Sequence, residues 1–204
     1  MPKDGTETRT QIMDTAEALI LDHGYAGTSV EAIVEAAGVT KGAFFHHFRS
    51  KMDLARALVE RYADLDAGLL ERTMEEAERA SDDPAEQLVA FVELCAEEME
   101  EFAEPHPGCL FASFCYEAQL FDADTHRIIR DATVLWRERL GAKVREAVAL
   151  HPPRIEVDPD ALADMLWVVF EGSFLLSRAM ADPEAVAVQL RQYRGYLELL
   201  FGVV

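Results

Sequence analysis

Apolar residues recur at helical spacing along nearly the whole 204-residue chain, and this periodicity limits the fold more than any other feature. Strand-like alternation is almost absent, and the prolines fall between the periodic segments or at their starts. The sequence therefore predicts an all-α protein of about nine helices. We expect these helices over residues 6–23, 28–36, 41–47, 50–80, 84–102, 109–120, 124–150, 158–180 and 183–200.

The two short segments near the start of the chain, 28–36 and 41–47, are separated only by Ala37-Gly38-Val39. This length is typical of a helix-turn-helix, whose second helix enters the major groove of DNA. Thr28 and Glu31 have the spacing of a capping box at the start of the first segment. We therefore expect a three-helix N-terminal helix-turn-helix domain over residues 1–50. Residues 51–204 are expected to form a separate C-terminal helical domain, with 51–80 as a connecting helix.

The net charge of −19 argues at first against a nucleic-acid partner. Residues 1–60, however, carry six Lys and Arg against nine Asp and Glu, which leaves −16 of the total to residues 61–204. Residues 38–52 contain Lys41, Arg49 and Lys51 and no acidic residue. A positive strip on an acidic body favours binding to DNA in one orientation, with an affinity that falls steeply as salt is added.

Several other classes of protein are disfavoured by the sequence. No uncharged apolar run is long enough to span a membrane, and the polar N-terminus lacks the apolar core of a signal peptide, so we expect a cytoplasmic protein. The three cysteines and six histidines show neither disulfide nor zinc-site spacing, so we expect no structural metal. No catalytic or phosphate-binding motif occurs, so we expect neither an enzyme nor a cofactor.

Three phenylalanines within five positions mark the predicted second helix of the motif. Val39, Phe44 and Phe48 fit a packed face against Ile33, Val34 and Ala37, whereas Phe45 is left outside it. An exposed aromatic side chain needs a reason, and contact with DNA would supply one. Taken singly, each polar residue nearby has a plain structural explanation, but their combined spacing favours the functional interpretation.

These residues also carry a family resemblance. The stretches GYAGTS at 24–29 and AAGVTKGAFFHHFRSK at 36–51, with Ile33 between them, resemble the DNA-binding domain of the TetR (tetracycline repressor-like) family. The similarity covers roughly residues 8–55, whereas the rest of the chain is similar only in length and helical architecture. It implies a homodimer that binds a palindromic operator on double-stranded DNA and responds to a small molecule, with repression favoured over activation. Residues 51–204 would then form the ligand-binding and dimerisation domain.

The resemblance also implies which residues contact bases and phosphates. A tyrosine often occupies the position of Phe45 in the family, and phenylalanine lacks the hydroxyl that would meet a phosphate. We therefore expect Phe45 to pack on a sugar or on a thymine methyl group. The predicted DNA-binding residues are Thr28, Ser29, Thr40, Lys41, Gly42, Ala43, Phe45, His46, His47 and Lys51.

Residues 84–180 are rich in large apolar side chains, which suits a pocket between helices for a small apolar or amphipathic effector. Most of these side chains are expected to be ordinary core. A carboxylate among them, Glu171, would favour a cationic ligand if it faces the pocket, although pairing with Arg178 or another helix is the alternative. The pocket candidates are Phe91, Cys95, Met99, Cys109, Phe111, Phe114, Glu117, Trp136, Trp167, Phe170, Glu171 and Phe174.

Two further expectations concern Cys109 and the last two helices. Cys109 begins a predicted helix, where the helix dipole lowers a thiol pKa, so a thiol-based sensor of oxidants or electrophiles on the same scaffold is the alternative function. The segments 161–180 and 185–200 are apolar on more than one face, which predicts a four-helix bundle with the same pair from a second subunit. A helical module without DNA binding is a third possibility.

Overall fold

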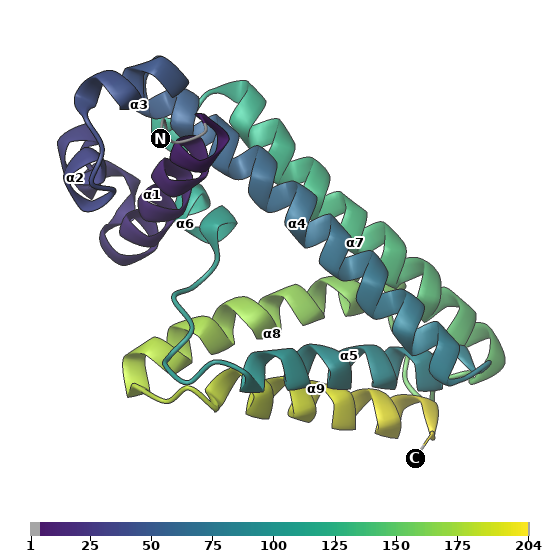
Figure 1. The fold of residues 1–204 in the computed structure, drawn as a ribbon. Coiled ribbons are helices and arrows are strands. Elements are labelled where there is room, and N and C mark those ends of the chain that lie inside the picture. Colours follow the sequence, from purple (N-terminus) through teal and green to yellow (C-terminus); the bar gives the residue numbers. More distant parts are fainter. Residues whose placement is uncertain (1–4, 204) are drawn as a thin grey trace. The chain divides into compact units, whose positions relative to one another are not determined.

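The computed structural model describes residues 5–203 and is helical throughout, with no strand in that range. The first four residues, on which the expectation about the N-terminus partly depends, lie outside the described range. The helices are α1 (Gly5–Gly27), α2 (Val30–Ala36), α3 (Lys41–His47), α4 (Lys51–Ala80), α5 (Pro84–Glu100), α6 (Leu110–Tyr116), α7 (Ala123–Leu150), α8 (Pro159–Met180) and α9 (Ala185–Phe201), with a short 3-10 helix, η1 (Ala118–Leu120), after α6 (Figure 1). The predicted all-α class and the number of α-helices are confirmed over these residues.

Local capping explains where several of these helices begin. The side chain of Asp83 accepts hydrogen bonds from the backbone N–H groups of Ala85 and Glu86, and Pro84 occupies the first turn of α5. Asp158 and Pro159 repeat this arrangement at α8. A capping side chain satisfies amide groups that have no partner inside the helix. The same Asp-Pro pair therefore fixes the start of two helices in different parts of the chain.

The chain divides into two compact units, and the division does not follow chain order. The first unit contains residues 1–64 and 107–130, and the second contains residues 65–106 and 131–204. The boundaries therefore fall inside α4 and α7, and α6 belongs to the first unit. The sequence pattern, by contrast, places α6 in the C-terminal domain expected after residue 50.

In the second unit α9 packs against both α5 and α8 (Figure 1). Its core is built from large side chains of several helices, including Leu70, Phe91, Trp136, Leu166 and Leu190. The hydroxyl of Tyr193 donates a hydrogen bond of 2.8 Å to the carbonyl of Leu162, which satisfies a buried polar group between α8 and α9.

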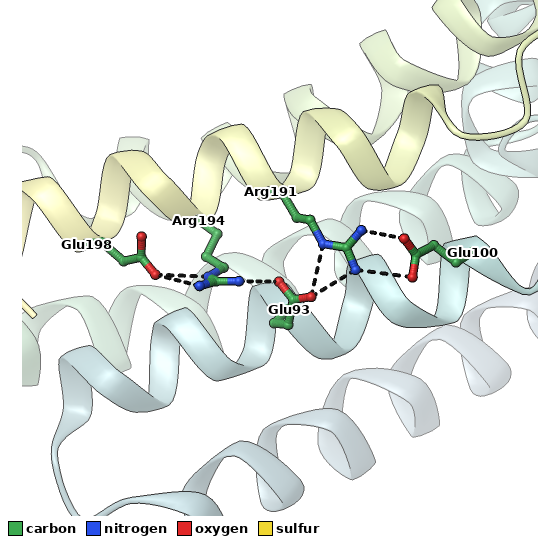
Figure 2. Close-up of polar contacts among 5 residues, drawn as sticks. All are labelled: Glu93, Glu100, Arg191, Arg194 and Glu198. Atoms are coloured by element: carbon green, nitrogen blue, oxygen red, sulfur yellow. Dashed lines mark hydrogen bonds and ion pairs between the residues drawn. The ribbon is translucent and has the colours of Figure 1, made fainter. Parts of the chain in front are cut away.

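Charged side chains join α5 to α9 along the edge of this core (Figure 2). The carboxylate of Glu93 accepts hydrogen bonds from Arg191, at 2.9 and 3.0 Å, and from Arg194, at 2.7 Å. Arg191 also pairs with Glu100, and Arg194 pairs with Glu198. The guanidinium groups hold the pKa of Glu93 below its ordinary value, although partial burial opposes them. The network fixes the register of the two helices.

No helix within residues 5–203 combines the length and the apolarity that a membrane crossing demands.

Candidate nucleic-acid interface

The two helices of the predicted motif are each capped by a side chain. Ser29 accepts a hydrogen bond of 3.0 Å from the N–H of Ala32 at the start of α2, and Thr40 accepts one of 3.1 Å from Ala43 at the start of α3. The predicted capping box of Thr28 and Glu31 is wrong by one residue, because Ser29 is the N-cap. Thr28 is instead buried, and its hydroxyl donates to the carbonyl of Gly24 at 2.9 Å.

The turn between α2 and α3 is a Schellman motif. Gly38 has a φ of 62°, and its N–H donates to the carbonyl of Glu35, while the N–H of Val39 reaches back to Val34. Only glycine adopts this conformation without cost. Gln11 of α1 also donates a hydrogen bond of 2.7 Å to the carbonyl of Ala37. These bonds hold α3 at a fixed angle to α2.

The sides of α3 differ sharply in exposure. Phe44 and Phe48 are buried, together with Ile33 and Ala37 of the preceding helix and turn, as the sequence predicted, whereas Val34 and Val39 of the same predicted face are half-buried. Phe45 is 46% exposed. Among the other predicted DNA-binding residues of α3 and its cap, Thr40, Lys41, Gly42 and His46 are exposed, and Ala43 and His47 are half-buried. The predicted outer surface of α3 is therefore available to a large partner.

Lysines in this region have partners within the protein. The ammonium of Lys41 pairs with Glu31 of α2 at 2.6 Å on the surface, and this pairing lowers the pKa of Glu31. The ammonium of Lys51 donates to the carbonyls of Tyr25 and Thr28 at 2.7 and 2.8 Å, and burial lowers its pKa. Lys51 thus stabilises the turn before α2, whereas Lys41 stays on the surface.

The turn at residues 24–28 is also held from the opposite side, by Glu117 at the end of α6. The carboxylate of Glu117 accepts hydrogen bonds from the backbone N–H groups of Tyr25, at 2.7 Å, and Ala26, at 2.9 Å. Gly24 has a φ of 74°, and a Cβ atom there would lie 2.9 Å from the Glu117 carboxylate. We call this arrangement of Gly24, Tyr25, Lys51 and Glu117 the turn clamp.

Aromatic packing supports the turn clamp. The rings of Phe114 and Phe121 stack with centroids 4.2 Å apart, and both rings contact Tyr25 of α1. Arg56 of α4 pairs with Asp122, which also caps α7 through Thr125. These hydrogen bonds to Thr125 lower the pKa of Asp122 most, and Arg56 lowers it further, to about 2. Residues 107–130 are therefore an integral part of the first unit.

The predicted pocket residues divide between the two units. Cys109, Phe111, Phe114 and Glu117 belong to the first unit. The others belong to the second unit, where Phe91, Cys95, Met99 and Trp136 are buried, and Trp167, Phe170, Glu171 and Phe174 are half-buried. Cys109 is the N-cap residue of α6 and is buried, with 7% of the residue exposed.

Sequence reasoning missed several residues that matter in these units. Arg9 lies 5.2 Å from the centre of the Phe48 ring, and Arg61 ties α4 to Asp14 and Glu17 of α1. Asp66 of α4 accepts a hydrogen bond from Trp136. A polar residue between apolar positions of a helix gives no local sign of its tertiary partner, so the pattern alone could not have found these contacts.

Two capped helices joined by a tight turn, with one apolar face buried and the outer side of the second helix exposed, define a helix-turn-helix DNA-binding protein. Residues 12–58 match the family of bacterial regulatory proteins, tetR family, and residues 84–193 match the tetracyclin repressor-like, C-terminal domain. The chain therefore belongs to the TetR family of transcriptional regulators.

Individual relatives agree with this membership. The chain is 30% identical over 165 residues to the transcriptional regulator AcuR of Cereibacter sphaeroides. The aligned residues cover 81% of this chain and 74% of AcuR. It is 28% identical over 173 residues to the HTH-type transcriptional repressor DhaR of a Mycobacterium species, covering 83% and 82% of the two chains. A regulatory protein TetR from Rhodobacter sphaeroides superposes with a TM-score of 0.74 at 26% identity, covering 92% and 97%.

Proposed function

We propose that this chain is a homodimeric repressor, which binds a palindromic operator through the outer side of α3 and is released by a small-molecule effector bound in the second unit. The exposed surface of α3, with Phe45 standing out beside the buried Phe44, carries the proposal. A repressor named among its relatives, DhaR, supports the direction of regulation. A mobility-shift assay with the DNA upstream of the protein's own gene tests it, since a repressor of this kind shifts that DNA and a non-binding helical module does not.

Release by an effector is a shift between two populations of the dimer. An effector that binds more tightly to the form in which the two α3 helices no longer fit adjacent grooves will lower operator affinity. A hundredfold reduction needs only about 2.7 kcal/mol of differential binding. An effector that binds and leaves operator affinity unchanged would contradict this mechanism.

Glu31 is expected to limit operator affinity, because its carboxylate occupies the Lys41 ammonium that a DNA phosphate would otherwise use. We expect Glu31→Gln to raise operator affinity at low salt by about two- to fivefold. Lys41→Ala should lower it about fivefold or more and should reduce the slope of log affinity against log salt by about one. Fluorescence anisotropy with labelled operator at several salt concentrations measures both effects.

The matched control for this prediction is Asp164→Asn. Asp164 pairs with Arg137 on the surface of the second unit, so the variant removes one negative charge and one ion pair without touching the motif. It should leave operator affinity nearly unchanged. Equal gains in Glu31→Gln and Asp164→Asn would mean that overall charge, and not the Lys41 contact, sets the affinity.

The dimer is proposed to form through α8 and α9. Exposed small and apolar residues follow one line of α8 at spacings of three and four. A line with the same spacing on α9 joins the exposed Val188, Gln192 and Leu199 to the half-buried Gly195. Added Cβ atoms at Gly172 and Gly195 would meet nothing within the chain, which leaves room for a close partner helix. The α8 line consists of Ala161, Met165, Val168, Gly172, Leu175 and Ala179, and the α9 line consists of Val188, Gln192, Gly195 and Leu199.

Charged substitutions in the α8 line should therefore separate the subunits. Val168 and Leu175 are 67% and 71% exposed, so Val168→Glu/Leu175→Glu should fold but bury unpaired carboxylates in the dimer. We expect a monomer by light scattering and at least a tenfold loss of affinity for a two-half-site operator. Leu150→Glu, at a residue that is 58% exposed on α7, is the control and should remain dimeric. A charged double variant that stays dimeric would rule out this surface.

A further inference from the structure

One carboxylate of the second unit is withdrawn from water without a cation beside it. Asp66 of α4 is half-buried, and Nε1 of Trp136 donates a hydrogen bond of 2.6 Å to its Oδ2. Within the described residues this is its one hydrogen bond, and no Lys, Arg or His pairs with it. Burial raises the pKa of Asp66 to about 6, although the Trp136 hydrogen bond opposes this rise.

Two other partly buried carboxylates of the same unit are neutralised. Glu78 pairs with Arg139 and Lys143, and Glu93 pairs with two arginines. Several cations of α7 and α9 are therefore engaged elsewhere, and none compensates Asp66. An isolated carboxylate out of water is costly, and a merely structural acceptor for an indole N–H could be neutral. A binding site for a cationic ligand carries such an unneutralised carboxylate while the site is empty.

The surroundings of Asp66 suit an organic cation better than a metal ion. Trp136 of α7 contacts Phe91 of α5 and Trp167 of α8 edge-on, with ring centroids 6.2 Å apart in both pairs. Aromatic rings attract alkylammonium groups through their faces and offer no ligand to a metal. The acidic balance of residues 61–204 also raises the local concentration of cations.

We propose that Asp66, together with Trp136 and Trp167, recognises an organic ammonium ion with an apolar body, and that the effector of this regulator belongs to that class. The second half of this proposal rests on the proposed function, whereas the binding site itself does not. The sequence analysis named Glu171 of α8 as the carboxylate that would favour a cationic ligand, whereas this proposal assigns that contact to Asp66 of α4. The ligand's ammonium group would pair with the Asp66 carboxylate while its alkyl groups contact the indole rings.

The chain supplies its own reporter for this site. Trp136 and Trp167 are the two tryptophans of the sequence, so intrinsic tryptophan emission reports only on their surroundings. The probes are choline, tetraethylammonium and benzyltrimethylammonium, with 3,3-dimethylbutan-1-ol as the neutral isostere of choline. Titrations at pH 8, where Asp66 is ionised, should show a saturable change in emission with at least one cation and a tenfold weaker response, or none, to the neutral isostere.

Asp66→Asn provides the decisive comparison, because asparagine still accepts the Trp136 hydrogen bond but carries no charge. We expect cation affinity to fall at least tenfold in Asp66→Asn and to stay unchanged in Asp164→Asn. Circular dichroism should show the same helix content in all variants. At pH 8 the Asp66→Asn variant should also melt roughly 5 °C higher than wild type, and the difference should vanish below about pH 3, where the Asp66 carboxyl is neutral in the folded and the unfolded chain alike.

The remaining outcomes separate the two proposals. The site is overturned if no cation of the panel binds, if Asp66→Asn binds cations as well as wild type, or if Glu171→Gln alone removes binding. If the cation binds as described but operator affinity stays constant, the site stands and the proposed effector response fails. If neutral molecules release the operator equally from wild type and Asp66→Asn, the effector response stands and the ammonium class is overturned.

Discussion

Replacing Phe44 with alanine is expected to unfold the helix-turn-helix, while the same replacement at the adjacent Phe45 leaves it folded. Phe44 is completely buried and contacts the rings of Phe45 and Phe48 at centroid distances of 5.2 and 5.8 Å. Loss of a buried phenylalanine costs about 3–5 kcal/mol, which is a large share of the stability of a small unit. Thermal denaturation followed by circular dichroism should show an early transition in Phe44→Ala.

Phe45→Ala serves as the internal comparison, because the two residues are neighbours of the same type. Its ring is 46% exposed, so the variant should keep its stability within about 0.5 kcal/mol. Operator affinity should nevertheless fall about tenfold, since the ring is proposed to pack on the DNA. A stable Phe45→Ala protein that binds operator normally would show that this exposed ring has no part in DNA recognition.

Gly24→Ala is the second substitution with a large expected effect. The φ of 74° and ψ of 163° at Gly24 lie in a region that side-chain-bearing residues avoid, at a cost of about 1–3 kcal/mol. The added Cβ would also press on the Glu117 carboxylate and weaken its bonds to Tyr25 and Ala26. We expect a loss of about 3 kcal/mol in the free energy of unfolding and a parallel loss of operator affinity, because the turn clamp positions the start of α2.

Gly27→Ala is the control for this substitution. A Cβ atom at Gly27 would meet His23 at 3.6 Å, which is ordinary van der Waals contact, so the variant should be neutral or slightly more stable. Denaturant titration of both variants measures the difference. Similar stability in Gly24→Ala and Gly27→Ala would mean that the turn relaxes freely and that Glu117 does not hold it.

Features determined by residues close in sequence were predictable. The bounds of α3 at 41–47 and of α4 up to residue 80 match the sequence patterns, because Thr40 and Ser50 are capping residues and Gly38 suits the turn. The backbone break at Gly24 agrees with the end of the predicted first helix at residue 23. Thr28 and Ser29 are both of a residue type that caps helices. The burial of Thr28 in the tertiary structure leaves Ser29 as the N-cap of α2.

Features determined by distant residues were not predictable. Glu117 lies 92 residues from Tyr25, and nothing in the local sequence around Glu117 points to that contact. The same contact accompanies the early end of α6 at Tyr116, where a helix to residue 120 was expected, because Glu117 leaves the helical conformation. Asp66 likewise lies within a regular helical pattern, and the absence of a neutralising cation becomes visible only when α4, α5, α7 and α8 are packed.

The composition of the first unit has a practical consequence for protein engineering. Because residues 107–130 complete that unit, a fragment that ends at residue 50 or 64 lacks the Phe114 and Phe121 rings that cover Tyr25. Such a fragment would expose apolar surface, and it would lack the Glu117 carboxylate that binds the turn before α2. To exchange operator specificity between regulators of this type, both stretches of the first unit, residues 1–64 and 107–130, should therefore be transferred together. In a chimaera with only the N-terminal stretch, Tyr25 and its turn would pack against residues of the other protein.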